Sequence, residues 1–95
     1  MEKFYKNINI CILYGRIVSD INFNFFYNSR INNSLVEFEI ELNYKYSTRK
    51  LKNEKVIIKA YDNIADKIYS KYRIEDYIEI LGRVTAKGIE VTQIV

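Results

Sequence analysis

Residues 55–72 read KVIIKAYDNIADKIYSKY, and the spacing of apolar side chains changes within this stretch. Over residues 55–61 one set of small and branched apolar side chains occupies every second position, which is typical of a β-strand with one buried face. Asp62 is a favourable helix N-cap, and after it Ile64 and Ile68 fall on one helical stripe. The stretch therefore predicts one strand followed directly by one short amphipathic helix.

The chain before this stretch predicts two further strands. Residues 8–17 are rich in β-branched side chains, and Gly15 is the position at which a strongly bent strand would omit a side chain. Residues 22–28 continue in extended form and lead into polar, turn-prone residues. Residues 34–46 alternate apolar and polar side chains over their whole length, which is the clearest strand pattern in the sequence. We therefore expect a long, bent first strand that turns back into a second.

Residues 47–54 are expected to form a basic loop between the second and third strands. Beyond the helix, residues 77–85 and 89–95 predict two more strands, joined by a tight turn at residues 86–88. This order of elements is that of the OB-fold, an all-β class with one helix, in which five strands form a barrel and the helix lies between strands 3 and 4. A β-grasp fold or an SH3-like barrel would place the helix elsewhere or omit it.

Composition predicts one domain that carries out no catalysis. The 95 residues, 48% of them apolar, suffice for one core, so we expect a single domain over residues 1–95. With no histidine and one cysteine, Cys11, the chain offers no disulfide framework, no metal-ligand spacing and no nucleophile paired with a base. We therefore expect no enzyme activity, no metal and no cofactor. No apolar run reaches the ~18 residues of a membrane span, and the expected location is the cytoplasm.

Positive charge is concentrated in one segment. The net charge of the chain is +3, but residues 45–55 contain five basic residues and one acidic residue, so they carry +4 and the remainder carries −1. Nine tyrosines and five phenylalanines supply many aromatic faces. Basic groups beside aromatic faces are the combination that binds single-stranded nucleic acid.

Several stretches resemble the bacterial single-stranded DNA-binding protein family. The first runs from Tyr61 through the helix (YDNIADKI) to residues 77–84 (YIEILGRV), and the others are residues 11–17 (CILYGRI) and 36–40 (VEFEI). The resemblance covers nearly the whole chain. It implies binding of single-stranded DNA without sequence preference, in replication, recombination or the maintenance of plasmid or phage DNA. It also implies that two base-stacking aromatics of the family fall on Tyr61 and Tyr46.

The chain departs from that family at three points. The family's tryptophan at the start of strand 3 falls on Lys55, and its tryptophan on the hairpin between strands 4 and 5 has no counterpart, because residues 86–88 shorten that hairpin to a turn. The sequence ends at Val95, so we expect no acidic-tipped tail. In that respect it is similar to primosomal replication protein N.

The predicted nucleic-acid site combines aromatic and basic residues. Tyr46 and Tyr61 would stack on bases, and Lys55 and Lys59 would neutralise phosphates from one face of the third strand. The other expected contacts are basic residues of the loop and of the fourth strand and two aromatic residues of the first hairpin: Arg49, Lys50, Lys52, Arg83, Phe25 and Tyr27.

These residues also have structural interpretations. Tyr46 and Tyr61 could cap the core with their hydroxyls in water, the basic loop could be an ordinary solvated surface, and the hairpin aromatics could be core or subunit contacts. Glu37, Glu39 and Glu41 form a negative stripe on the outward face of the second strand, which a bound strand should avoid. The rival function is a protein-interaction module of a replication or conjugation complex, and RNA is an alternative to DNA.

The first strand is the expected subunit contact. Members of the family that this chain resembles pair their first strands across a dimer, and residues 7–11 (NINIC) are the edge available for it. We therefore expect a homodimer, with a tetramer as the alternative.

Overall fold

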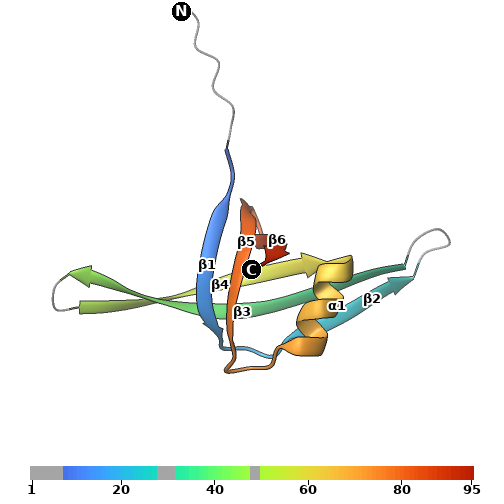
Figure 1. Cartoon of the computed structure of the whole chain (residues 1–95), viewed down its shortest axis with the longest axis horizontal. Coiled ribbons are helices and arrows are strands. Elements are labelled where there is room, and N and C mark those ends of the chain that lie inside the picture. Colours follow the sequence, from blue (N-terminus) through green and yellow to red (C-terminus); the bar gives the residue numbers. More distant parts are fainter. Residues whose placement is uncertain (1–7, 28–31, 48–49) are drawn as a thin grey trace, which may run out of the picture.

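A computed structural model describes residues 8–27, 32–47 and 50–95, and at residues 26–27, 32, 44–47 and 50–52 it describes the backbone alone. The elements are β1 (Cys11–Ile17), β2 (Asn22–Tyr27), β3 (Asn32–Ser47), β4 (Lys50–Tyr61), α1 (Asp62–Lys71), β5 (Tyr77–Thr85) and β6 (Gly88–Ile94) (Figure 1). The expected class, an all-β chain with one helix, is confirmed for the part of the chain that is described.

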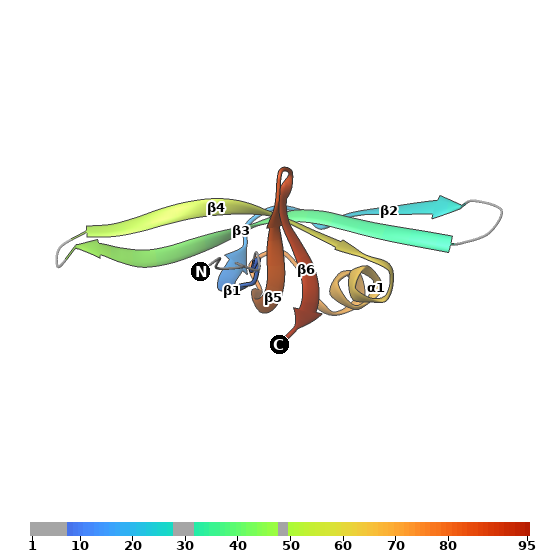
Figure 2. The same cartoon turned by 90° about the horizontal axis from the view of Figure 1, so that it is seen from above.

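Five of the strands form a closed ring. β1 pairs with β5, β5 with β6, and β3 with β4, all antiparallel, while β6 runs parallel to β4. Arg16 and Ile17 close the ring by pairing with Glu41 and Ile40 of β3. β2 pairs with β3 outside the ring. The barrel expected for an OB-fold is therefore present. Figure 2 shows the β3–β4 hairpin reaching out on one side of it and the β2–β3 hairpin on the other.

Three details of the predicted elements are wrong. The first strand divides at residues 18–21 into β1 and β2, so the helix lies between β4 and β5 instead of between strands 3 and 4. Of the expected loop at residues 47–54, Ser47 belongs to β3 and residues 50–54 belong to β4, while residues 48–49 lie outside the described residues. Pairs such as Lys45 with Leu51 continue the ladder and satisfy the backbone hydrogen bonds, which the basic side chains do not prevent. Asp62 is not a side-chain N-cap: Tyr61 precedes the helix, and no side chain caps it.

The core is apolar and is formed by the faces that alternation predicts. Alternate residues are buried in the part of β3 from Ser34 to Ile40 and in the part of β4 from Ile58 to Ala60, and buried residues of β1, β5, β6 and α1 pack against them. The buried apolar residues are Ile17, Val36, Phe38, Ile40, Ile58, Ala60, Ala65, Ile68, Ile78, Ile80, Ile89 and Val91. The residues that alternate with these buried ones point away from the core, and we call the surface that they form the outward face.

The helix covers one end of the ring. Ala65 and Ile68 are buried, and Ile64 and Tyr72 pack against the core beside them, as the helical stripe predicts. α1 contacts β3, β4 and β6. No helix among the described residues is long and apolar enough to cross a membrane.

The three glycines all lie where strands come too close for a side chain, and two of them, Gly15 and Gly88, bear on the fold near the site. An ideal Cβ on Gly15 would lie 2.7 Å from the carbonyl oxygen of Glu41, so the predicted omission of a side chain in the bent first strand is confirmed. Gly88 has φ +126°, and a Cβ there would lie 2.5 Å from the carbonyl oxygen of Ile57. This glycine lets β6 start directly beside β4, which brings the β5–β6 turn next to the outward face of β4.

Candidate nucleic-acid interface

A row of charged side chains crosses four strands on the outward face. Glu37 of β3 is opposite Lys59 of β4, Lys59 is opposite Glu90 of β6, and Glu90 is opposite Arg83 of β5. Lys59 Nζ lies 3.1 Å from a carboxylate oxygen of Glu37, and Arg83 Nε lies 2.5 Å from a carboxylate oxygen of Glu90. The row therefore alternates in sign, and both of its cations have carboxylate partners.

An open hollow of about 300 Å³ lies at the end of this row, beside the β5–β6 turn. Its lining residues are Lys59, Tyr61, Arg83, Thr85, Ala86, Lys87 and Glu90. We call it the basic hollow, because its three cations outnumber its single carboxylate. Lys87 makes no ion pair with a described residue, so its charge is available to an incoming anion. The charge that attracts phosphate at this hollow is therefore chiefly that of Lys87.

Tyr61 gives the basic hollow an exposed aromatic face. It is the last residue of β4, opposite Leu35 of β3, and it remains 44% exposed. Strand alternation places it on the same face as Lys59, two residues earlier. An aromatic ring beside three cations is the combination that holds one nucleotide, with the base on the ring and the phosphate on the cations.

A second hollow, of about 450 Å³, borders the first. It is lined by Asn33, Ser34, Tyr61, Asp62 and Glu90, and we call it the polar hollow. Tyr61 and Glu90 line both hollows, so Tyr61 stands between a mainly cationic and a mainly hydrogen-bond-accepting environment.

The structure separates the two predicted stacking tyrosines. Tyr46 lies at the irregularity between Lys45 and Ser47, and Ser47 pairs with Lys50 at the far end of β4. Lys50 precedes Tyr61 by 61 − 50 = 11 residues, which is about 36 Å along a strand. The backbones of Lys50 and Lys52 lie near Tyr46, while the side chains of all three residues and the whole of Arg49 lie outside the described residues.

Phe25 does not join Tyr61. It pairs with Ser34, whose side chain is buried on the α1 side of β3, so Phe25 lies on the opposite face from Lys59 although it is 58% exposed. The backbone of Tyr27 pairs with Asn32, and its side chain lies outside the described residues. Phe23, on the same face as Phe25, stacks on Tyr69 of α1 with ring centroids 4.6 Å apart.

The glutamate stripe lies beside the lysines and not apart from them. Glu37 pairs with Lys59, and Glu41 pairs with Lys55, which is exposed. A strand that contacts these lysines therefore cannot avoid the stripe altogether, contrary to expectation. The carboxylates reduce the attraction for phosphate over β3, so the β5–β6 side of the face is the more favourable one.

Sequence reasoning missed Lys87, Glu90, Asn33 and Asp62 as residues of this surface. The signal that could have found Lys87 is the turn at residues 86–88, which offers its side chain beside β4. For Glu90 no local signal exists, because only the parallel pairing of β6 with β4 places it next to Lys59.

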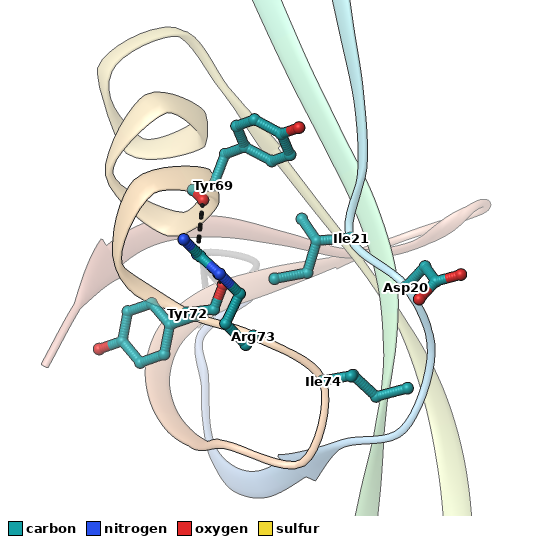
Figure 3. Close-up of a pocket in the computed structure, with 6 residues that line it drawn as sticks. All are labelled: Asp20, Ile21, Tyr69, Tyr72, Arg73 and Ile74. Atoms are coloured by element: carbon teal, nitrogen blue, oxygen red, sulfur yellow. Dashed lines mark hydrogen bonds between the residues drawn. The ribbon is translucent and has the colours of Figure 1, made fainter.

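A third hollow, of about 440 Å³, lies at the C-terminal end of α1 (Figure 3). It is lined by Asp20, Ile21, Tyr69, Tyr72, Arg73 and Ile74. Arg73 Nη1 donates to the carbonyl oxygens of Tyr69 and Tyr72, at 3.1 and 2.9 Å. The guanidinium thus satisfies free carbonyls of the helix terminus, which is a structural role.

Arg16 fixes the point at which the ring closes. It donates hydrogen bonds to Glu75, in the segment after α1, and to Glu41 of β3, the latter at 3.4 Å. The hydrogen bond with Glu75 and its negative charge raise the pKa of the Arg16 guanidinium further above its ordinary value. Arg16 is therefore a structural cation and not a phosphate ligand of the basic hollow.

The described residues contain no group of three or more His, Cys, Asp or Glu side chains that could hold a metal ion. The surface of Lys59, Tyr61, Arg83 and Lys87 thus offers stacking, hydrogen bonds and charge.

The closed five-stranded ring with its single helix defines an OB-fold. No family model matches the chain, and no curated protein matches it in sequence. Among solved structures, the SSB domain of a Synechococcus protein is similar with a TM-score of 0.71 at 17% identity, covering 96% of this chain and 98% of that one. PriB from Ralstonia solanacearum is similar with a TM-score of 0.73 at 10% identity, covering 94% and 98%. The Plasmodium falciparum SSB in complex with single-stranded DNA has a TM-score of 0.71 at 22% identity, covering 85% and 73%. These similarities confirm the OB-fold.

Proposed function

We propose that this protein binds single-stranded DNA without strict sequence specificity, in replication, recombination or the maintenance of plasmid or phage DNA. The observation that carries the proposal is the exposed ring of Tyr61 in a hollow lined by Lys59, Arg83 and Lys87. The similarity in fold to SSB domains and PriB, one of them solved with single-stranded DNA, supports it. The protein acts by binding and not as an enzyme.

Binding proceeds through one stacked nucleotide and its phosphates. A base lies on Tyr61, and Lys87 meets a phosphate without having to leave a carboxylate partner. Lys59 and Arg83 have partners in Glu37 and Glu90, so they turn toward phosphate only by exchanging one charged hydrogen bond for another. The net gain from each of these two residues is therefore smaller than that from Lys87.

The test is fluorescence anisotropy of a labelled oligothymidylate of about 20 nucleotides, longer than the roughly 4–16 that one OB domain spans. Tyr61→Ala should weaken binding about 5-fold or more, because one stacked base contributes ~1–3 kcal/mol. Phe25→Ala is the matched control: it removes a comparably exposed ring from the opposite face, and its affinity should equal that of wild type.

Three other outcomes would change the assignment. Equal losses in both variants would show that the binding surface wraps around β2. If wild-type protein fails to bind at low salt, DNA binding is excluded and the surface belongs to a protein partner. Tighter binding to an oligouridylate of the same length would assign the site to RNA.

We also propose a homodimer formed through β1. One edge of β1 pairs with β5 over Cys11–Arg16, while its other edge pairs with β3 only at Arg16 and Ile17. Residues 11–14 therefore pair with no second strand in the described part of the chain, whereas Gly15 already lies against Glu41 of β3. Of the edge predicted at residues 7–11, Asn7 lies outside the described residues and residues 8–10 precede β1. The open edge supports pairing with a second copy.

A further inference from the structure

The polar hollow beside Tyr61 is lined by groups that can read the edge of a base. Asp62 directly follows Tyr61 in the chain, and Asn33 lies next to Ser34 on β3. Among the described residues, neither the Asp62 carboxylate nor the Asn33 amide has a hydrogen-bond partner. A volume of about 450 Å³ is within the range of small-molecule sites.

The backbone holds Asp62 at this place. Its φ is +56°, a left-handed conformation that is unusual for a residue other than glycine. The Ser34 hydroxyl, buried in β3, lies 3.1 Å from the carbonyl oxygen of Asp62 and 2.8 Å from Oδ1 of Asp66, and so ties the first turn of α1 to β3. The carboxylate of Asp62 is thus positioned next to the stacking ring by the fold and not by a partner of its own.

We propose that the polar hollow prefers guanine among the four bases when a base is stacked on Tyr61. The Asp62 carboxylate accepts hydrogen bonds from the adjacent N1–H and N2–H donors of guanine, and the Asn33 amide donates to guanine O6. This inference rests on the proposed binding of single-stranded DNA and adds one base-reading contact to it.

The chemistry of the other bases fits the hollow less well. A carboxylate offers two acceptors side by side, which matches two adjacent donors. Thymine presents one N–H between two carbonyl oxygens, and those oxygens repel a carboxylate. Cytosine and adenine present an amino group next to an acceptor nitrogen, so each supplies one donor group where guanine supplies two. Hydrogen bonds to a charged group are the strong ones, so the difference is measurable even at a solvated site.

The experiment compares three labelled strands of about 20 nucleotides at one fixed salt concentration. They are oligothymidylate, alternating thymidine and deoxyguanosine, and alternating thymidine and deoxyinosine. Deoxyinosine differs from deoxyguanosine only by the missing 2-amino group, so it removes one of the two donors and leaves stacking nearly unchanged. We expect the guanine strand to bind about 5-fold or more tighter than both others.

Asp62→Asn is the diagnostic variant. Asparagine adopts positive φ readily, so the backbone conformation is kept while the second acceptor and the charge are removed. Its affinities for the three strands should lie within about 2-fold of one another, as expected when the bidentate contact is lost. Asp20→Asn is the matched control, because it removes one carboxylate from the third hollow, which lies apart from Tyr61. It should raise all three affinities alike and keep the preference for guanine.

The outcomes separate this inference from the proposed function. If wild-type protein binds the three strands equally and in a salt-dependent manner, the base preference is wrong and binding of single-stranded DNA stands. If Asp62→Asn keeps the preference, Asp62 is not the reading residue and the proposal is overturned. If no strand binds, both the proposed function and this inference are wrong.

Discussion

Ser34 joins the core to the candidate site through one hydroxyl. Among the described residues, Ser34 is the polar residue that is buried. Its hydroxyl lies within hydrogen-bond distance of the Asp62 carbonyl oxygen and the Asp66 carboxylate of α1. A buried hydroxyl without such partners would cost more to bury than it contributes. Its partners explain why a serine stands in a row of β3 positions that otherwise face the apolar core.

Ser34→Ala should lower the free energy of unfolding by about 1 kcal/mol, because the hydrogen bonding of this hydroxyl to the Asp66 carboxylate and the Asp62 carbonyl oxygen is lost, while the exposed carboxylate can bind water instead. The measurement is urea unfolding followed by circular dichroism. Ser70→Ala, on the exposed side of the same helix, is the control and should change stability by less than about 0.5 kcal/mol. A Ser34→Ala protein as stable as wild type would contradict the role given to this hydroxyl.

Gly88→Ala should destabilise the protein by about 2 kcal/mol or more. The added Cβ would meet the carbonyl oxygen of Ile57 at 2.5 Å, and alanine is strained at φ +126°. The measurement is the midpoint of urea unfolding, and Lys87→Ala in the same turn is the control. A midpoint unchanged by Gly88→Ala would mean that β6 can move away from β4 at little cost.

At the scale of elements, the long β3–β4 hairpin shows which part of a strand the alternation of apolar residues can predict and which part it cannot. Alternation located the buried faces of β3 and β4 correctly, because burial of every second residue leaves a mark in the sequence. It did not show that pairing continues through Lys50 and Lys52, because residues 47–54 contain one apolar side chain, Leu51, and so carry no alternation that could be recognised. The division of the first strand into β1 and β2 was also missed, although Ser19 and Asp20 between the two strands are residue types that favour turns.

The open edge of β1 predicts the effect of a charge on assembly. Wild-type protein should elute with about twice the mass of one 11.4 kDa chain. Ile12→Lys, at a residue that is 67% exposed, should give the mass of a single chain, because an edge lysine opposes strand pairing and would lie near its own copy in a two-fold pair.

Light scattering coupled to size-exclusion chromatography measures both masses. Ile57→Lys, on the exposed face of β4, is the control and should keep the dimer. A wild-type protein that runs as a single chain would remove the dimer proposal, whatever the variants do.

At the scale of the whole molecule, the candidate site is assembled by tertiary pairing. Tyr61 and Lys59 were predicted from one strand, and Arg83 from another, because each follows a local pattern. These residues line one hollow with Lys87 only because β6 pairs in parallel with β4, and no single stretch of sequence predicts that pairing. The same pairing places Glu90 between Lys59 and Arg83, so the net positive charge of the hollow is lower than its three basic residues alone would give.

Salt dependence should report how many cations of the basic hollow meet phosphate. For single strands the logarithm of affinity falls with the logarithm of salt concentration by about 0.7 per neutralised phosphate. Lys87→Gln should make that slope shallower by about 0.7. Lys67→Gln, which removes the same charge from exposed α1, should leave it unchanged. Equal slopes for Lys87→Gln and wild type would exclude Lys87 as a phosphate contact.

The pairing of β1 with β5 also has a consequence for folding during synthesis. Cys11 lies opposite Gly82, so its partner follows 82 − 11 = 71 residues later in the chain. At a synthesis rate of about 5–20 residues per second, β1 waits for β5 for about 4–14 seconds. During that time Ile12 and its apolar neighbours have no native partner strand. Nascent chains of this protein should therefore expose an unpaired β1 to chaperones, or to other copies of the chain, for several seconds, which is longer than their small size suggests.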